Sequence, residues 1–375
     1  TFRKADDLPP WVRRNYDRWT TWTDRLHMEL IDFNMFISPT EIEHKRRLKV
    51  IHGLKQLVKS IDKKAKVKVF GSFKTLLYLP TSDLDVVIFY NDQDSESLKK
   101  GKIRDKDKEK DNEQGTGTIT STIMGTTKCN KASTIGFKQR LFNALIGSKN
   151  GVSYIEMIET ARVPILKYTD KESHINVDIA FNKMTGVLAA KEINTLQKKF
   201  PMLRMLSNFL KYFLWYRNLH EPYFGGMGSY LLQMLIIHML QAHPMYSQNT
   251  IPNVWEECTL GSFLLAFLEM FGFHFNFSRL GISPYPHPHY FQKHAVFNGR
   301  NYHGHNHALQ ATLWDEIAPS TENSGGGQPF MLCVKCPFES TDHVFMDAGK
   351  NSFNIMKIRS AFQYASKLSL RINMT

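Results

Sequence analysis

The sequence predicts an α+β protein of two domains, one built on a mixed sheet flanked by helices and the other built of helices. Three observations support this prediction. Apolar residues alternate in short runs as far as about residue 182, and from about residue 196 they recur at helical spacing. A chain of 375 residues exceeds what one hydrophobic core usually organises. The content of hydrophobic residues, 42%, is that of a globular chain.

Two helices are predicted at the start of the chain. The first spans about residues 11–33, because its apolar residues fall close to helical spacing, and it needs a partner surface. The second runs from Ser38 to about Asp62. Ser38 would be its N-cap, Pro39 its first residue, and Glu41 would complete a capping box. The predicted core stripe of this helix is Ile42, Val50 or Ile51, Leu54, Leu57 or Val58, and Ile61.

Strands are predicted after the second helix. The segment VKVF ends at Gly71 and Ser72, and after a turn at Pro80 the segment DLDVVIFY forms the next strand. A helix is expected over about residues 137–146. The strand-like segments that would extend the same sheet lie at residues 152–170 and 174–182.

Two stretches do not have the composition of a core. Residues 91–133 are mainly small, polar or charged, which indicates a disordered insertion. Residues 283–330 are rich in proline, histidine, asparagine and glycine, which indicates a second loose insertion. We therefore expect a sheet domain over residues 45–195 and a helical domain formed by residues 1–44 and 196–375. The later helices of that domain are expected at residues 203–219, 228–243, 260–272 and 355–370.

The balance of charge favours a polyanionic partner. The chain has 48 lysines and arginines against 35 aspartates and glutamates, a formal charge of +13 and a pI near 9.4. Nucleic acid is the leading candidate, and a solvated lysine-rich surface is the alternative. One basic run allows the same two interpretations, a path for RNA or a solvated helix face. It comprises Lys45, Arg46, Arg47, Lys49, Lys55, Lys59, Lys63, Lys64, Lys66 and Lys68.

Cysteine content and hydropathy indicate an intracellular protein without a membrane span. The cysteines, 4 in all, are too few for a disulfide framework, and the start of the chain does not resemble a signal peptide. The most apolar stretch, residues 260–275, is interrupted by Glu269 and is shorter than the roughly 20 apolar residues that cross a bilayer. We interpret this stretch as a core helix.

Asp83 and Asp85 are the residues that point most directly to chemistry. In a strand, residues i and i+2 face the same side, so the two carboxylates would project together while Leu84 faces the core. Carboxylates at this spacing can share magnesium ions about 3.5 to 4 Å apart, as in phosphoryl transfer. An exposed turn is the alternative for an isolated pair. Asp178, within a second apolar strand, likewise requires a cation as its partner.

These residues resemble the signature of the DNA polymerase β-type nucleotidyltransferase superfamily: Gly-Ser, an Asp-x-Asp about ten residues later, and a third acidic residue on a later strand. A narrower resemblance, from about residue 45 to the end, is to the Trf-type poly(A) polymerases, the RNA-tailing subunits associated with the nuclear exosome. It is carried by the segments FGSFKTLLYLPTSDLDVVIF, VPILKYTD, VDIAFNKMTGVLAA, LKYFLWYRNL, GGMGSYLLQML and AGKNSFNIMKIRSAFQYA.

The resemblance implies a catalytic domain that contains a mixed sheet, a helical PAP-associated domain onto which the N-terminal helix packs, and a nucleotide cleft between the two. It implies two magnesium or manganese ions on Asp83, Asp85 and Asp178, with Asp178 also accepting the proton of the RNA 3′-hydroxyl. Ser72 and Lys211 would contact phosphate. The residues implied to bind the nucleotide are Gly71, Ser72, Gly186, Lys211, Ser229, Tyr230, Met346 and Lys350.

Departures from the family pattern bear on the choice of base. Cys336 stands where the family has aspartate, and Met346 and Lys350 stand for a base-reading asparagine and an arginine. Related uridylyltransferases have histidine at the Met346 position and an asparagine where this chain has Ala189, which favours ATP over UTP. His343, a few residues away, could swing into the same place and keeps the alternative open.

The resemblance implies a template-independent RNA 3′-adenylyltransferase that acts in RNA surveillance and decay. The alternatives are a terminal uridylyltransferase and a catalytically silent RNA-binding scaffold. Implied partners are the RNA 3′ end, ATP, a zinc-knuckle RNA-binding protein and an RNA helicase, in the nucleus with a cytoplasmic location also possible. A zinc site at Cys333 and Cys336 is disfavoured because a second ligand pair is missing. The histidines from His287 to His307 are interpreted as part of a loose loop.

Overall fold

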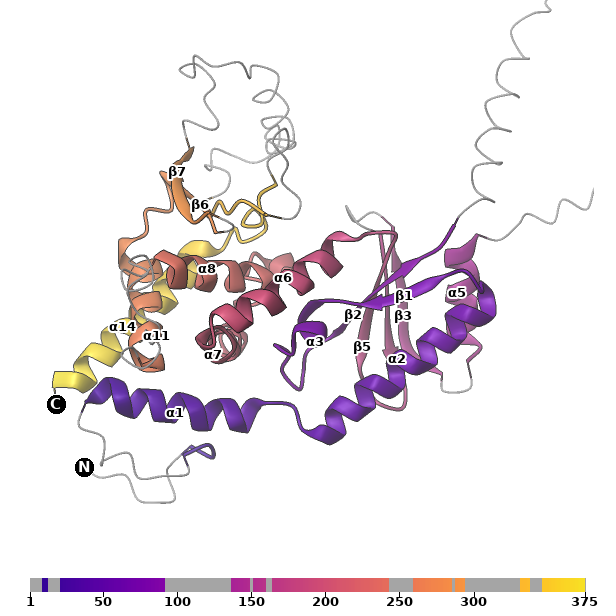
Figure 1. Ribbon diagram of the computed structural model, residues 1–375, viewed down its shortest axis with the longest axis horizontal. Helices are drawn as coiled ribbons and strands as arrows, with labels where there is room; N and C mark the ends of the chain where they lie inside the picture. Colours follow the sequence, from indigo (N-terminus) through magenta and orange to yellow (C-terminus); the bar gives the residue numbers. More distant parts are fainter. Residues whose placement is uncertain are drawn as a thin grey trace, which may run out of the picture. The chain divides into compact units, whose positions relative to one another are not determined.

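The chain divides into two compact units (Figure 1). The sheet unit comprises Glu41–Val69 and Asp83–Met184, and the helical unit comprises Thr1–Thr40, Phe70–Ser82 and Thr185–Thr375. The computed structural model describes residues 9–12, 21–91, 136–148, 151–159, 164–242, 259–284, 287–293, 331–337 and 346–374.

The two units divide the chain differently from the predicted domain boundaries, which stay a prediction. Phe70–Ser82 groups with the helical unit, although it lies between two strands of the sheet unit in sequence. The short helix α3 (Gly71–Thr75) packs against α6 (Thr185–Lys199), and Leu77 is fully buried in the core of the helical unit.

The sheet unit contains the predicted mixed sheet. Its five strands lie in the order β1-β2-β5-β4-β3, in which β2 and β5 are parallel and every other pair is antiparallel. The strands are β1 (Lys66–Val69), β2 (Leu84–Phe89), β3 (Val152–Ile158), β4 (Ile165–Asp170) and β5 (Asn176–Phe181). The helices of this unit are α2 (Glu41–Ile61) and α5 (Phe137–Ile146).

One face of the sheet is apolar and covered by α2 and α5. The two helices pack against each other and onto the outer strands β1 and β3. Because side chains alternate along a strand and in-register neighbours share a face, the covered face of the central strands can be read from the pairing. Its residues on β2 and β5 are Leu84, Val86, Ile88, Val177, Ile179 and Phe181, all buried.

The predicted capping box at Ser38 is wrong. Ser38 instead ends helix α1 (Trp22–Ile37), where its hydroxyl donates to the backbone oxygen of Asn34 at 2.6 Å, and α2 begins at Glu41. Ile42 is consequently 65% exposed rather than part of the core stripe. The middle of the stripe is confirmed, since Val50, Ile51, Leu54 and Val58 are buried, whereas Ile61 at its end is only partly buried.

The helical unit is organised around one large core. Its helices, besides α1, α3 and α6, are α7 (Met202–Tyr216), η3 (Pro222–Phe224), α8 (Ser229–Ala242), α11 (Leu260–Glu269), the π-helical turn η4 (Met270–His274) and α14 (Ile355–Met374). As expected, the N-terminal helix packs into this unit: α1 contacts α7 and α11. None of the described helices is long and apolar enough to span a bilayer.

The predicted loose insertion at residues 283–330 is wrong in its first part. β6 (Leu280–Ser283) and β7 (His289–Gln292) form an antiparallel hairpin. Lys293 anchors its end, because its ammonium donates to the backbone oxygens of Phe277 and Met331, each at 2.6 Å. The remainder of this insertion, and nearly all of the insertion at 91–133, lie outside the described residues.

Candidate functional site

The sheet brings Asp85 and Asp178 together on the face opposite α2 and α5. Asp85 of β2 pairs in parallel register with Asp178 of β5, so their side chains start from neighbouring positions on one face. Asp83, directly before β2, reaches the same face: Asn176 of β5 donates its side-chain N–H to Asp83 Oδ1 at 3.2 Å. Leu84, between the two aspartates, is fully buried, as expected.

A lysine is the counter-charge of Asp178 on this face. Lys167 pairs with Asp178 across β4 and β5, and its Nζ lies 2.9 Å from Asp178 Oδ2. The two side chains are 37% and 23% exposed, so the ion pair is partly shielded from water. Sequence reasoning missed this residue, although a single basic residue inside an apolar strand-like run was a usable signal.

The carboxylates have the donor chemistry for a divalent cation, but their oxygens do not converge. In the described part of the chain, no three His, Cys, Asp or Glu side chains are close enough together to hold a metal ion. Neighbouring strands lie about 4.8 Å apart, so rotation of the Asp85 and Asp178 side chains is enough to bring their oxygens to one ion. Carboxylate oxygens suit magnesium and manganese, and these residues therefore fit the expected group.

Gly71 and Ser72 begin a short helix rather than a plain turn. Gly71 has φ +62°, a left-handed conformation that favours glycine, and starts α3. The N–H groups of a first helical turn have no acceptor within the helix, so they can donate hydrogen bonds to phosphate oxygens. Thr75 closes the other end by donating its hydroxyl to the backbone oxygen of Ser72 at 3.1 Å.

The structure gives Gly186 and Lys211 roles in packing as well. A Cβ atom at Gly186 would lie 2.5 Å from the ring of Phe70, so glycine lets the start of α6 lie against the residue that precedes Gly71. Lys211 on α7 is buried, and its ammonium donates to the backbone oxygen of Leu77 at 2.7 Å. Both residues hold the Phe70–Ser82 segment in the helical unit.

Cys336 links two of the predicted base-contacting residues of the helical unit, Tyr230 and Met346. Ser229 and Tyr230 begin α8, and the Tyr230 hydroxyl lies 3.5 Å from Cys336 Sγ. The backbone N–H of Cys336 donates to the backbone oxygen of Met346 at 2.8 Å. The start of α8, the segment that ends near Cys336 and the segment that begins at Met346 are therefore linked to one another. Lys350 lies four residues after Met346 in the last of these segments. His343 lies outside the described residues, as do the histidines from His294 onward.

Asp347, which sequence reasoning also missed, holds the turn after Met346. Its Oδ1 accepts N–H bonds from Val334 at 2.9 Å and from Gly349 at 2.7 Å. Burial raises the pKa of Asp347 to about 6, against the opposing effect of these N–H groups and of Lys293. Burial also lowers the pKa of Lys293 and raises the pKa of Cys333, the other titratable neighbours.

This burial makes the contribution of Asp347 to stability depend on pH. Between about pH 4 and pH 6 the native state binds more protons than the unfolded chain, whose aspartate pKa is near 3.8, so stability falls as pH rises. The free energy of unfolding of the wild type, relative to Asp347→Asn, is therefore expected to decrease across this window. Urea unfolding at a series of pH values measures it. A constant difference between the two proteins would contradict the assignment.

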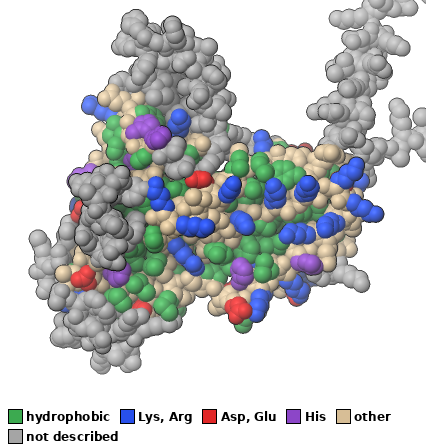
Figure 2. Space-filling model, in the orientation of Figure 1, with side chains coloured by type: hydrophobic (Ala, Val, Ile, Leu, Met, Phe, Trp, Pro, Cys, Tyr) green, Lys and Arg blue, Asp and Glu red, His purple; other side chains and the backbone are tan. Residues whose placement is uncertain are grey.

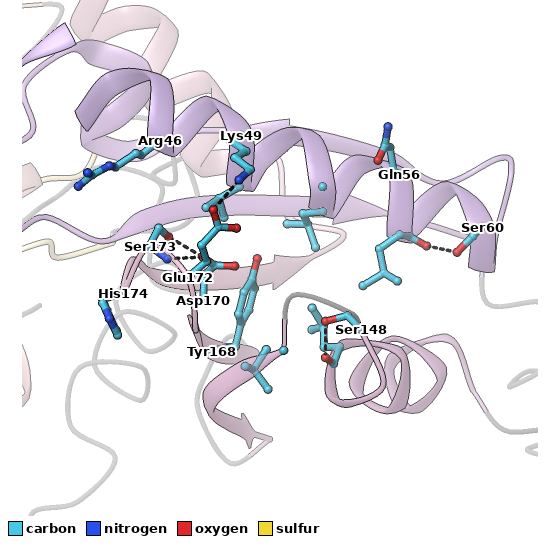
Figure 3. A pocket seen from close by; sticks show the side chains of 17 residues that line it. Arg46, Lys49, Gln56, Ser60, Ser148, Tyr168, Asp170, Glu172, Ser173 and His174 are labelled. Carbon is cyan, nitrogen blue, oxygen red and sulfur yellow. Dashed lines mark hydrogen bonds and ion pairs between the residues drawn. The ribbon is translucent and has the colours of Figure 1, made fainter. Parts of the chain in front are cut away.

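A cavity in the sheet unit lies away from the carboxylates. It has a volume of about 610 Å³ and lies between α2, α5 and the turn after β4 (Figure 3). Tyr168 lines it, and Tyr168 faces away from its neighbour Lys167, so the cavity opens on the helix-covered face. Lys49 and Glu172 form an ion pair of 2.6 Å across its mouth, and Asp170 accepts hydrogen bonds from Ser173.

Comparisons with known proteins point to one family. Residues 26–198 match the central palm domain of mitochondrial-like poly(A) RNA polymerases. The chain is 29% identical to poly(A) RNA polymerase gld-4 of Caenorhabditis elegans, covering 98% of this chain and 36% of that protein. It is 27% identical to poly(A) RNA polymerase protein 2 of Saccharomyces cerevisiae, covering 96% and 50%. The chain thus spans half or less of the length of these relatives.

Two further comparisons concern the fold and the alternatives. The polymerase core of TRAMP, an RNA surveillance complex, superposes with a TM-score of 0.67 at 26% identity, covering 98% of this chain and 94% of that one. The poly(U) polymerase Cid1 shares the fold, with a TM-score of 0.61 at 16% identity over 92% and 94%. The inactive poly(A) RNA polymerase protein Trf4-2 of Drosophila melanogaster is 27% identical, covering 90% of this chain and 66% of that protein.

Proposed function

The chain belongs to the Trf-type poly(A) RNA polymerases of the polymerase β-like nucleotidyltransferase superfamily, and on that premise we propose that it adds AMP from ATP to RNA 3′ ends without a template. The observation that carries the proposal is the parallel register of Asp85 with Asp178, with Asp83 beside them. A chain that lacked this register would have the fold without a place for the reaction.

The three aspartates would hold two magnesium or manganese ions. When bound, such ions supply a Lewis acid for the phosphates and lower the pKa of the attacking hydroxyl. Within this chain, Lys167 keeps Asp178 oriented and compensates part of the negative charge on the face. Asn176 orients Asp83 through the hydrogen bond that its side chain donates.

The reaction joins the RNA 3′-oxygen to the α-phosphorus of ATP and breaks the bond from that phosphorus to the pyrophosphate oxygen. Asp178 would accept the proton of the 3′-hydroxyl, since a carboxylate within hydrogen-bond reach can act as a general base. Gly71, Ser72, Lys211 and Ser229 would bind the phosphates, and the charge that develops on pyrophosphate is best met by the compact ammonium of Lys211. The bond that Lys211 donates to the backbone oxygen of Leu77 fixes where its ammonium lies.

Tyr230 would stack on the base, with Gly186, Met346 and Lys350 around the nucleotide. Met346 offers a thioether where a base-reading polar side chain is expected, which removes one contact that a uracil-selective site needs. The backbone bond between Cys336 and Met346 fixes where this side chain starts. These residues support ATP rather than UTP as the substrate.

ATP is therefore expected to outcompete UTP in a single tailing reaction. Purified protein, a labelled single-stranded RNA and magnesium are incubated with ATP and UTP at equal concentration, and the added nucleotides are identified. We expect mainly adenylate tails, because discrimination by a few contacts amounts to about 10 to 200-fold. Mainly uridylate tails would instead support the terminal uridylyltransferase alternative, which the shared fold with Cid1 keeps open.

The absence of tailing with every nucleotide would support a silent RNA-binding scaffold, for which Trf4-2 is the precedent among the relatives. A thermal shift with ATP and magnesium but no product would be the positive result for that alternative. All three aspartates are present here, which favours an active enzyme.

We place this activity in nuclear RNA surveillance, with a zinc-knuckle RNA-binding protein and a helicase as partners that choose the RNA. The support is the likeness to the polymerase core of TRAMP. Co-purification of tagged full-length protein from nuclei tests the partners.

A further inference from the structure

The exposed part of the predicted basic run divides into two surfaces once the strands are paired, whereas Arg47 of this run is buried and belongs to neither. Arg46 and Lys49 face the cavity on the flank of α2 toward β4. Of the other lysines, Lys55 and Lys59 belong to the opposite flank of α2, Lys63 and Lys64 to the turn after it, and Lys66 and Lys68 to β1, the edge strand of the sheet. We call one set of these the basic edge; it consists of Lys55, Lys59, Lys63, Lys64, Lys66 and Lys68, all exposed.

The β1 lysines lie on the face that carries the aspartates. Lys68 pairs with Val87 and Lys66 with Phe89, and Val87 is two residues from Asp85 on the same face. Diagonal neighbours of this kind are about 7 to 8 Å apart. Lys68 lies over the ring of Phe89, at 5.5 Å from its centroid, which confirms that its side chain is on this face.

The α2 lysines continue the basic edge around the side of the sheet. The chain reverses between Ile61 and Lys66, so residues equally far from the reversal lie level with each other. With rises of about 1.5 Å per helical residue and 3.3 Å per strand residue, Lys55 lies roughly 9 Å from the end of α2 and Lys68 roughly 7 Å from the start of β1, so the two are nearly level. α2 and β1 are in contact, so the two rows of lysines flank one edge.

The charge of this edge is largely uncompensated. Lys45 and Lys49, which are not part of it, have ion pairs with Glu41 and Glu172. For the basic edge, no ion pair is found within the described chain. Asp62 is the acidic residue of this stretch. Figure 2 shows Lys and Arg side chains gathered over α2 and β1, with few acidic side chains among them.

We propose that the basic edge binds the phosphates of the RNA upstream of its 3′ end, which passes from the carboxylate face over β1 onto α2. This inference rests on the proposed function and specifies where its RNA lies. Lysines are suited to the task because they bind phosphates as point charges without reading sequence. Exposed lysines also protect edge strands from pairing with other chains, and the experiment separates that role from RNA binding.

The test is the salt dependence of binding to a single-stranded RNA of about 20 nucleotides, measured by fluorescence anisotropy without ATP or metal. The edge variant carries Lys55→Gln, Lys59→Gln, Lys66→Gln and Lys68→Gln. The matched control carries Arg46→Gln, Lys49→Gln, Lys191→Gln and Lys198→Gln. These remove the same charge from the cavity flank of α2 and from exposed positions on α6.

The slope of log K against log salt is negative, and each lost phosphate contact on a single strand reduces its magnitude by about 0.7. The edge variant lacks four lysines, so the magnitude of its slope is expected to fall by roughly 3. At about 0.1 M salt its affinity should fall on the order of 10²-fold, and the loss should shrink for an RNA of about 3 nucleotides. Circular dichroism and thermal unfolding verify that both variants fold.

An equal loss of slope in the control, or none in the edge variant, would overturn the proposal. A loss that does not depend on RNA length would also overturn it, because the upstream phosphates would then not be what these lysines contact. Wild-type protein that binds long RNA through this edge but extends no RNA with any nucleotide would leave this inference standing and refute the proposed function.

Discussion

Replacement of Asp85 by asparagine is expected to abolish RNA tailing while the protein remains folded. Asp85 is the central carboxylate of the face, in register with Asp178 and two residues from Asp83. Asparagine keeps the shape but removes the charge that a divalent cation requires. Loss of a residue that merely supports a metal ligand costs about 10 to 100-fold, so loss of this ligand should cost on the order of 10³-fold or more in kcat.

The fold should tolerate this change because like charges clustered on one face do not stabilise it. Thermal unfolding without metal is therefore expected to be unchanged or slightly raised in Asp85→Asn. A smaller shift of the unfolding midpoint on addition of magnesium than in the wild type would show that the residue acts through the ion. Product formation is measured on denaturing gels with labelled RNA and ATP.

Asp170 provides the matched control, since it ends β4 but lines the cavity on the opposite face. Asp170→Asn keeps an oxygen to accept the hydrogen bonds from Ser173, so tailing should remain within a few-fold of wild type. Tailing by Asp85→Asn at a rate close to that of Asp170→Asn would refute the assignment of the catalytic face.

Substitution of Gly261 by alanine is expected to destabilise the protein by forcing α11 away from α1. Gly261 lies in α11, where a Cβ atom would come within 2.3 Å of the backbone oxygen of Thr23 in α1. Backbone cannot rotate away as a side chain can, so the two helices must separate. Overpacking of this kind typically costs about 1 to 3 kcal/mol, measured here by urea unfolding.

Gly53 is the control for the intrinsic effect of the substitution. It lies within α2 with nothing inside 4 Å of the position that a Cβ atom would take. Gly53→Ala should therefore stabilise the protein by roughly 0.5 to 1 kcal/mol through helix propensity. Opposite signs for the two variants are the expected result, and destabilisation of similar size in both would show that the contact with Thr23 is not the cause.

Helices with strong apolar periodicity were predictable from the sequence. The predictions at residues 203–219, 228–243 and 355–370 correspond to α7, α8 and α14 within a few residues. α7 has a broad buried face, and α8 is an apolar run that is buried on all sides from Leu231 to Gln241. The strand around Asp85 was equally clear, since charged residues bounded an apolar run of β-branched residues. Periodicity of this kind is local and therefore visible in one chain.

The errors arose where two local signals compete. Ser38, Pro39 and Glu41 make a valid capping box, but Ser38 is taken up by the end of α1, so α2 starts later. The β6–β7 hairpin was missed because its stabilising contacts come from elsewhere: Lys293 reaches Phe277 and Met331, and Ile282 bridges to Val334. Composition alone indicated a loop there.

The sequence by itself predicted that Asp83 and Asp85 project to one side, because side chains in extended backbone alternate, and this holds although β2 begins only at Leu84. Only the tertiary structure decided that β5 lies beside β2 in a register that places Asp178 next to Asp85, with Lys167 against it. The order and register of strands depend on how distant segments bury their apolar faces together, and that free energy is shared across the whole core. For the same reason, only the pairing of β1 shows that Lys66 and Lys68 face the aspartates.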